Sequence, residues 1–440
     1  MSAAYRSAGK KPAKRRLISR SSRKPKQNGI GKKTNKRAVR TRRTQQRSTG
    51  MQRQHSPLIQ GLFQQRQKKL DAPMLLITLM LLGIGLIALL SSSYPKAYYS
   101  SDIGPFYYFS RQLLFAVLGL AAMWVVSCYD YHKYTFWAKW LYLVSLIMLV
   151  LVLTPLGTSL NQAQRWLFGF QPSEIAKLAI ILLFATVAAG RPKSVHSMKS
   201  LMLYAALIGI YIVLLALEPH MSAAMILVVI AFTILFVAGM RIWFLIPVGI
   251  AGVIISIVAY FSMEHVRTRI HAFLDPFSVA SGKGWQSVQS LIAIGSGGTF
   301  GLGLGQSRQK FLYLPEPMND FIFSVVCEEL GFVGAVLILI LFAYFVFRGF
   351  YIAMHAKERF GALVAVGITM QFAFQILLNL AVVSGLFPVT GASLPLFSYG
   401  GTALMMQLVE IGILLNISRN SPPSKRDSWW EYLEKGAVLI

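Results

Sequence analysis

The stretch Gln306–Gly331, QSRQKFLYLPEPMNDFIFSVVCEELG, runs from a polar, charged segment directly into an apolar helix. The apolar part still carries Asp320, Glu328 and Glu329. A charged side chain at the centre of a membrane helix costs about 2.5–3.5 kcal/mol or more unless it is paired or hydrated. The stretch therefore indicates a membrane protein with a functional site where this loop enters the helix.

The composition of the whole chain supports the same class. Of its 440 residues, 55% are hydrophobic and 14% are charged, and the mean hydropathy is +0.54. Measured against a span of about 20 residues, ten apolar segments are predicted to cross the membrane: 74–93, 112–128, 138–155, 174–190, 201–217, 221–239, 243–262, 320–347, 360–384 and 399–417. We therefore predict an all-α polytopic membrane protein with about ten transmembrane helices and both termini on one side.

Basic residues in the short connections predict which side is cytoplasmic. They fall on the same side as the N-terminus: Lys133, Lys139, Arg191, Lys193, Lys199, Arg241, Arg348, Lys357 and Arg359. By the positive-inside rule this side, with both termini, is cytoplasmic. Residues 263–319, between the seventh and eighth helices, then form a large extracytoplasmic loop, and long loops often carry function.

The first 70 residues differ from the rest of the chain in charge. They hold 22 of the 44 Lys and Arg residues and no Asp or Glu. A segment this basic and poor in apolar clusters cannot bury enough surface to fold alone. We interpret residues 1–70 as a disordered basic cytoplasmic arm, 71–418 as the membrane domain and 419–440 as a cytoplasmic tail. The arm is expected to bind anionic inner-leaflet lipids, in preference to nucleic acid.

The predicted extracytoplasmic loop combines many glycines with cations and aromatic residues. Its glycines match no nucleotide-binding fingerprint, because no strand precedes them and no Gly-Lys-Ser or Gly-Lys-Thr follows. The cations and the adaptable backbone suit a phosphate-bearing ligand. A flexible re-entrant loop without a ligand is the alternative interpretation.

Asp320 lies at the junction of loop and helix, where two interpretations are open. Asn319-Asp320 before an apolar run is an ordinary helix N-cap sequence, and it also suits a catalytic carboxylate. On an ideal helix Glu328 is about 80° from Asp320, whereas Glu329 points to the opposite side. Asp320 and Glu328 are therefore expected to share a cavity, and Glu329 is expected to pair with a basic group elsewhere.

Further polar residues mark the ends of other spans. Glu174 and Lys177 are three residues apart at the start of the fourth span, which favours a buried ion pair over substrate contact. Glu218-Pro219-His220 is interpreted as a tight turn between the fifth and sixth spans. The last two spans are joined by an uncharged run with two prolines and three glycines, which indicates a connection packed inside the protein.

Four sequence blocks, taken in order, resemble one family. They are NQAQRW with QPSEIAK, then SLIAIGSGG, then GLGLGQSRQKFLYLPEPMNDFIF with EELG, and finally FPVTGASLPLFSYGG. They are similar to the SEDS family (shape, elongation, division and sporulation), the membrane glycosyltransferases of bacterial peptidoglycan synthesis, over about residues 74–418. The sequence of the third block resembles the division and sporulation branch (FtsW/SpoVE-like).

The resemblance implies a reaction and a set of site residues. The implied enzyme polymerises lipid II into β-1,4 glycan strands outside the cytoplasmic membrane, at the division septum or in the spore wall, with Asp320 as the catalytic residue. Candidate ligands for pyrophosphate or sugar are Lys310, Arg308, Gln309, Glu316, Arg267 and Arg269, of which Lys310 lies inside the matching block. Structural or cavity-lining roles are expected for Arg165, Trp166, Glu174, Lys177, Glu328, Gln375, Asn379 and Ser398.

The resemblance also implies partners, and it leaves alternatives open. The family pairs with a class B penicillin-binding protein, a transpeptidase, within division or sporulation complexes. A divalent cation, Mg or Mn, is compatible with a pyrophosphate leaving group, but no metal ligands are evident. A lipid II flippase and a non-catalytic division scaffold are the rival functions. Departures from the family pattern occur at Gln162 and Gln164, at His220 and at Pro317-Met318-Asn319.

Overall fold

The computed structural model describes residues 70–100, 104–160, 163–262, 264–275 and 283–420. All of them belong to the part of the chain that runs from Gln67 to Ile440. The predicted basic arm, apart from Leu70, and the tail beyond residue 420 lie outside the described residues.

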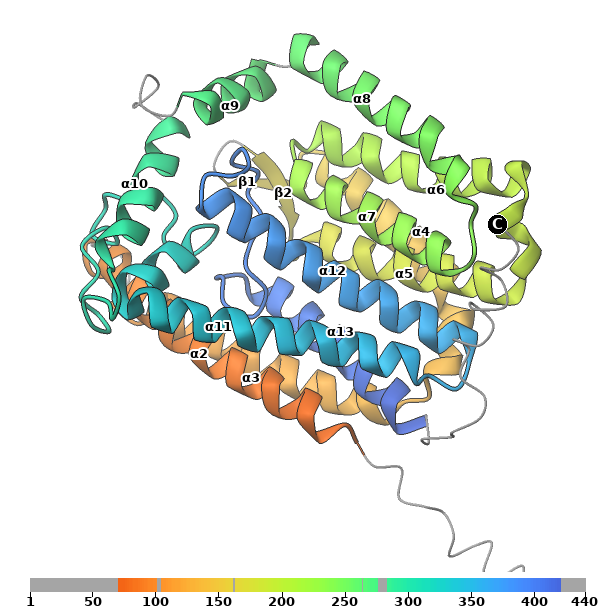
Figure 1. Cartoon of the computed structure of the whole chain (residues 1–440), viewed down its shortest axis with the longest axis horizontal. Coiled ribbons are helices and arrows are strands. Elements are labelled where there is room, and N and C mark those ends of the chain that lie inside the picture. The colour runs from red at the N-terminus through yellow and green to blue at the C-terminus, as the bar shows by residue number, and fades with distance from the viewer. Residues whose placement is uncertain (1–69, 101–103, 161–162, 263, 276–282, 421–440) are drawn as a thin grey trace, which may run out of the picture. The chain divides into compact units, whose positions relative to one another are not determined.

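The described residues are almost entirely helical (Figure 1). The long helices are α2 (Ala72–Tyr98), α3 (Tyr107–Cys128), α4 (Tyr134–Val152), α5 (Pro172–Gly190), α6 (Met198–Leu217), α7 (Met221–Val237), α8 (Leu245–Ser262), α11 (Ile322–Met354), α12 (Arg359–Val383) and α13 (Gly401–Asn420). Shorter elements are η1 (Tyr131–Lys133), η2 (Pro192–His196), η3 (Ile242–Phe244), α9 (Glu264–Leu274), α10 (Lys283–Ser296), β1 (Gly157–Leu160) and β2 (Ala163–Leu167).

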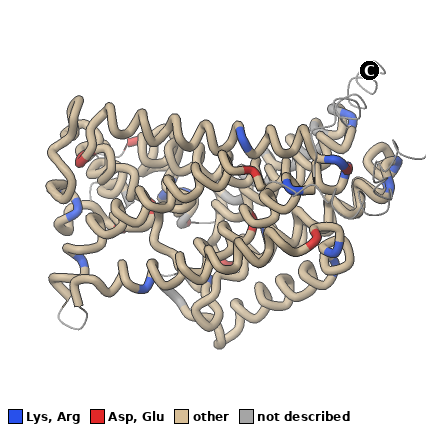
Figure 2. The backbone as a smooth tube through the Cα atoms, turned by 90° about the horizontal axis from the view of Figure 1, so that it is seen from below, with Lys and Arg blue, Asp and Glu red and all other residues tan. Residues whose placement is uncertain are grey.

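Each of the ten predicted spans overlaps one of the ten long helices. Among the described residues, eight of them are long and apolar enough to cross a membrane, namely α2 to α6 and α11 to α13, while α7, with 17 residues, is a shorter apolar helix. Figure 2 shows that most of the helical tube carries no Lys, Arg, Asp or Glu. The all-α polytopic class is confirmed, whereas the count of ten and the orientation stay predictions.

Two segments differ from the sequence-based expectation. The predicted loop at residues 263–319 is partly helical, because α9 and α10 lie within it. The connection between α4 and α5 is an antiparallel hairpin of β1 and β2, in which Gly157 pairs with Leu167 and Thr158 with Trp166. Hydropathy detects long apolar spans, so short amphipathic helices and a four-residue strand fall below its resolution.

The core of the bundle lies around α12. In its most apolar stretch, α12 is 78% buried, and α5 and α13 are each 67% buried. The corresponding stretches of α3 and α6 are only 22% buried. Helix α12 packs against α5, α7, α11 and α13. The central helices therefore bury nearly every face, while α3 and α6 keep an outer apolar face that suits lipid.

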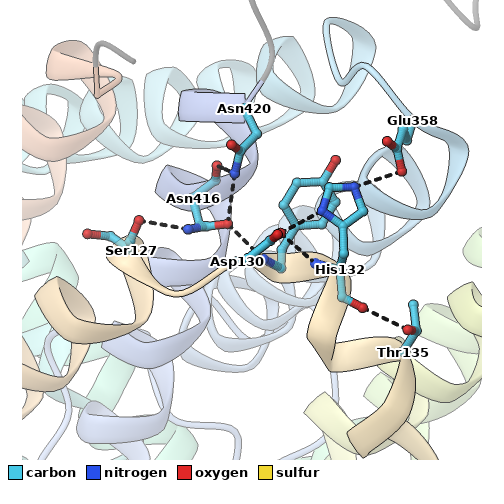
Figure 3. Close-up of polar contacts among 8 residues, drawn as sticks. Ser127, Asp130, His132, Thr135, Glu358, Asn416 and Asn420 are labelled. Atoms are coloured by element: carbon cyan, nitrogen blue, oxygen red, sulfur yellow. Dashed lines mark hydrogen bonds and ion pairs between the residues drawn. The ribbon is translucent and has the colours of Figure 1, made fainter. Parts of the chain in front are cut away.

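At one end of the bundle, polar contacts join helices that are distant in sequence (Figure 3). Asn416 of α13 accepts a hydrogen bond from the Tyr131 amide (3.0 Å) and donates one to the Ser127 carbonyl (2.8 Å). The two ring nitrogens of His132 lie beside Asp130 and, 2.8 Å away, Glu358. The ends of α3 and α13 and the starts of α4 and α12 therefore meet here, at the end predicted to be cytoplasmic.

The long helix α11 is interrupted at Gly331, whose φ of 66° and ψ of −168° are not helical. The interruption leaves backbone groups unpaired within the helix, and the segment before α11 supplies their partners. The amides of Leu302 and Gly303 donate to the carbonyls of Glu328 and Glu329, at 3.0 Å each. In return, the amide of Phe332 donates to the Gly298 carbonyl at 2.9 Å. Non-helical backbone at membrane depth is stable only when it is satisfied in this way.

The close approach of the backbone around Gly331 to residues 298–303, here called the crossing, predicts that Gly331 cannot be replaced. A Cβ atom at Gly331 would lie 2.2 Å from the Gly301 backbone nitrogen, and the positive φ disfavours any other residue. We expect Gly331→Ala to lower the free energy of unfolding by at least about 2 kcal/mol, measured by thermal unfolding in detergent. Gly209→Ala is the matched control, because its Cβ meets nothing within 4 Å. Equal melting temperatures for both variants would contradict the proposed role of the crossing.

Candidate active site

Asp320 lies two residues before α11, and the structure does not use it as a helix cap. The N-cap of α11 is Phe321, and no side-chain hydrogen bond caps the helix. The backbone beside Asp320 is held by other elements. Asn379 of α12 donates from one nitrogen to the carbonyls of Asp320 and Ala392, both at 2.7 Å, and Ser398 donates to the Asn319 carbonyl at 2.6 Å. The predicted structural residues Asn379 and Ser398 thus position the loop that carries Asp320.

The carboxylate of Asp320 faces a guanidinium from the β hairpin. Gly391, with a φ of +80°, lies where they meet, since a Cβ atom there would be 3.5 Å from Oδ2 of Asp320 and 3.6 Å from Nη1 of Arg165. Arg165 also donates to the Pro219 carbonyl. Its Nε and that of Arg269, in α9, are buried and have no hydrogen-bond partner. Two arginines from distant segments therefore stand near one carboxylate with donors free.

The surroundings of Asp320 set its protonation. The pKa of Asp320 is raised to about 6: burial is the largest cause, the Glu316 carboxylate also raises it, and Arg165 and Arg269 oppose both effects. Burial, and then the charge of Arg269, lowers the pKa of Arg165. A carboxylate with a pKa near 6 is ionised at neutral pH and is still basic enough to accept a proton from a hydroxyl group.

The turn between α6 and α7 contributes two buried ionisable residues to this region. Burial raises the pKa of Glu218 to about 8, with Arg165 opposing, and burial lowers the pKa of His220. Ser222 donates to the Gly391 carbonyl at 3.4 Å, which brings the turn against the site. The sequence was interpreted here as a tight turn, in preference to a metal ligand or a proton shuttle at His220. The signal that could have indicated a site is the presence of two ionisable residues at the end of an apolar helix, because such residues need a partner or water.

The predicted ion pair in α5 is present. The ammonium of Lys177 lies 2.8 Å from Glu174 and donates to Gln375 of α12 at 3.3 Å. Gln375 in turn donates to the Ser393 carbonyl at 3.0 Å. Glu174, Lys177 and Gln375 are buried, and they support the connection between α12 and α13. Trp166, half-buried in β2, pairs with Thr158 and helps to form the hairpin that presents Arg165.

Lys310 is placed differently from the sequence-based expectation. It is 3% exposed, and its ammonium lies 2.8 Å from Glu329 and 2.8 Å from the Ser91 hydroxyl. The prediction that Glu329 pairs with a basic group is thereby confirmed, and the partner is the cation that had been assigned to pyrophosphate. Lys310 therefore ties the loop to α11 and α2.

Glu328 serves the loop and not a cavity shared with Asp320. Its two oxygens accept hydrogen bonds from the Ser307 hydroxyl and from the amides of Arg308 (2.9 Å) and Gln309 (3.3 Å). The helical-face argument placed Glu328 near Asp320 because it treated Asp320 as part of the helix. Asp320 precedes α11, so that angle does not apply.

The other predicted pyrophosphate ligands separate into two groups. The side chain of Arg308 is exposed, and Arg267 is exposed and donates to the Phe261 carbonyl at 3.0 Å. Arg269 and Glu316 are close enough to Asp320 to alter its pKa. Of the four predicted cations, Arg269 is therefore the one that the structure brings to Asp320, and Arg165, predicted as structural, joins it.

A divalent cation has little support from the donor set. Within the described part of the chain, no group of three or more His, Cys, Asp or Glu side chains is arranged to hold a metal ion. Asp320 and Glu316 supply two carboxylates, and two arginines stand beside them. We therefore derive no step of the chemistry through a metal.

Comparison with known proteins identifies the family. A family profile described as "Cell cycle protein", FtsW/RodA/SpoVE, matches residues 72–422. The chain belongs to the FtsW/RodA/SpoVE family. This match covers every long helix and the candidate site.

Curated relatives of this family match along nearly their whole length. The chain is 41% identical to stage V sporulation protein E of Bacillus subtilis, over 80% of this chain and 97% of the relative. It is 39% identical to a probable peptidoglycan glycosyltransferase FtsW of Trichlorobacter lovleyi, over 80% and 94%.

Solved structures of family members share the fold. The chain matches a protein from a study of polymerisation and crosslinking by a peptidoglycan synthase complex, with a TM-score of 0.67 and 29% identity over 81% of this chain and 99% of that one. RodA of Thermus thermophilus matches with a TM-score of 0.58 and 28% identity, over 81% and 98%.

The ion pair of Lys310 predicts a stability defect. Removing one partner of a buried pair leaves an uncompensated charge, so we expect Lys310→Met to cost roughly 3–5 kcal/mol of stability. Adding Glu329→Gln should recover part of this loss, as measured by thermal unfolding. A Lys310→Met protein with an unchanged melting temperature but no activity would instead assign Lys310 to the substrate.

Proposed function

We propose that this chain is a peptidoglycan glycosyltransferase that polymerises lipid II into β-1,4 glycan strands, for septal or spore wall synthesis. Relatives at 36–39% identity over most of the chain are named as probable enzymes of this kind, and the relative at 41% is a sporulation protein. The observation that carries the proposal is the half-buried carboxylate of Asp320, with Arg165 and Arg269 near enough to act on its charge. This arrangement pairs a base with cations, as transfer from a pyrophosphate donor requires.

The reaction follows from these groups. The 4-hydroxyl of the N-acetylglucosamine on one lipid II attacks C1 of the N-acetylmuramic acid on another. The new C1–O bond forms as the bond from C1 to the pyrophosphate oxygen breaks, and the hydroxyl proton passes to Asp320. General base help of this kind contributes about 10²- to 10⁴-fold to the rate. The negative charge of Asp320 also stabilises the positive charge that develops on the donor sugar in the transition state.

Arg165 and Arg269 would stabilise the leaving undecaprenyl pyrophosphate. Guanidinium groups bind phosphate oxygens in a bidentate manner, and both have a buried Nε without a hydrogen-bond partner. Arg165 is held from behind by the Pro219 carbonyl. Fixed donors aimed at developing negative charge lower the barrier because they need no reorganisation during the reaction.

The proposed enzyme is a multi-pass protein of the cell membrane. Its proposed partner is a class B penicillin-binding protein, a transpeptidase. The structural relative from a peptidoglycan synthase complex that polymerises and crosslinks supports such a partner. The same proposal includes lipid II as the substrate and the division septum as the location. It also includes other division or sporulation proteins as partners.

A lipid II flippase remains the rival function, and one observation favours it. Glu410, Lys177 and Glu174 are buried in the helical bundle, and buried ionisable residues in membrane helices often mark transport pathways. A non-catalytic division scaffold is a further rival. Polymerisation of purified lipid II separates the proposed enzyme from both rivals.

Replacement of Asp320 tests the proposal. We expect the full chain with its cognate transpeptidase to form glycan strands from purified lipid II, and Asp320→Asn to form at most about 1% as much. Gel analysis of labelled strands measures this at equal amounts of folded protein. Labelled lipid crossing vesicles without any polymer would support the flippase. Normal growth of cells carrying only Asp320→Asn would support the scaffold.

The pH profile should report the ionisation of Asp320. The ionised form is the base, so the polymerisation rate should be constant above about pH 7 and fall about tenfold per unit below the pKa of about 6. Glu316→Gln removes a charge that raises this pKa, so it should move the acid limb to lower pH. An acid limb in the same place for both proteins would show that another group controls it.

A further inference from the structure

Five aromatic residues gather where α2 ends and α3 begins: Tyr94, Tyr98, Tyr99, Phe106 and Tyr107, here called the aromatic platform. Each side chain is between 40% and 62% exposed. The ring of Tyr94 stacks on that of Tyr98 (5.9 Å between centroids) and meets the edge of Phe106 (6.1 Å). Tyr98 also meets the edge of Tyr99 at 5.5 Å. Four of the rings are thus in contact, and Tyr107 follows Phe106 directly in the chain.

The aromatic platform is joined to the loop that carries Asp320. Lys96, within the platform's own turn of α2, has its ammonium 3.6 Å from the Glu316 carboxylate. On the other side, the platform's Tyr107 contacts Tyr108, and Tyr108 meets the ring of Tyr399 at 5.3 Å. The Tyr399 amide donates to the Met318 carbonyl at 2.8 Å. Figure 1 shows the end of α2 and the start of α3 at the same end of the bundle as α10 and the segment after it.

An interfacial aromatic belt is the ordinary explanation for exposed tyrosines at the end of a membrane helix. Exposed Phe136, Trp137 and Trp140 at the start of α4 fit such a belt, and the rings of Phe136 and Trp137 also meet, with their centroids 5.7 Å apart. The platform differs because a charged residue connects it to the loop that carries Asp320. Arg111 donates to the Tyr107 hydroxyl at 3.1 Å, and Lys96 pairs with Glu316.

This combination matches the surface of an amino sugar. One face of a pyranose ring presents C–H groups that pack on aromatic rings, and its edge carries hydroxyl and acetamido groups that bond to polar side chains. Tyrosine offers both an apolar body and a polar tip. The neighbouring Lys96, Arg111 and Glu316 supply further donors and acceptors at the edge of the rings.

We propose that the aromatic platform binds the β-1,4-linked N-acetylhexosamine strand as it leaves Asp320. The inference rests on the proposed function, since it assigns the platform to the product of that reaction. A strand held beside the site stays in place between additions, so the platform lengthens strands by slowing their release.

The test compares the full chain in lipid nanodiscs with Tyr98→Ala/Tyr99→Ala/Phe106→Ala. Saturation-transfer NMR measures binding of chitohexaose, the soluble β-1,4-linked hexamer of N-acetylglucosamine. We expect wild type to bind and the triple variant to bind at least about tenfold more weakly. Tyr98→Phe/Tyr99→Phe keeps the rings and should retain binding. Phe136→Ala/Trp140→Ala is the matched control, because it removes exposed aromatic residues at the opposite end of the bundle.

The second readout is strand length in the lipid II reaction. The triple variant should give strands several-fold shorter per lipid II consumed, and the control variant should match wild type. Equal hexamer binding and equal strand lengths for the triple variant and the control would overturn the inference and leave an interfacial belt. If the triple variant does not fold, Tyr98→Ala alone, at a 62% exposed position, gives the same two readouts. Absence of polymer from wild type would contradict the proposed function. The hexamer-binding comparison would still test whether the aromatic platform binds a glycan strand.

Discussion

The pairing of the interrupted helix α11 with the segment before it is the constraint on which the site depends. Because Gly331 is not helical, the carbonyls of Glu328 and Glu329 must find donors elsewhere, and the amides of Leu302 and Gly303 supply them. The same two glutamates use their side chains on residues 307–310. The backbone and side chains of one helical turn therefore fix the loop that leads to Asp320.

Helix α12 carries the polar counterpart of this arrangement. Gln371, Gln375 and Asn379 are spaced four residues apart, so they lie along one face. Gln371 donates to Glu410 at 2.8 Å, Gln375 accepts from Lys177, and Asn379 donates to the Asp320 carbonyl. Amides satisfy buried polar groups without adding charge, which suits the helix with the largest buried share of its apolar window.

The ion pairs within the bundle differ from the charged groups around Asp320. Lys177 with Glu174, and Lys310 with Glu329, form close buried pairs at 2.8 Å, whose energy goes into holding elements together. Arg165 and Arg269 instead keep donors without partners. An incompletely satisfied charge is costly in a folded protein, and it is justified where a ligand supplies the missing partner.

The sequence by itself determined the helical membrane class and the position of each long helix, and it predicted a site at Asp320, because long apolar runs and ionisable residues within them are local signals. It also indicated that Glu174 would pair with Lys177, since residues three apart share a helical face. Only the tertiary structure decided which cation meets which carboxylate. Lys310 meets Glu329 and Arg165 lies near Asp320, partners that lie 19 and 155 residues away along the chain. Such contacts depend on how helices pack and where α11 is interrupted, and no local pattern encodes that.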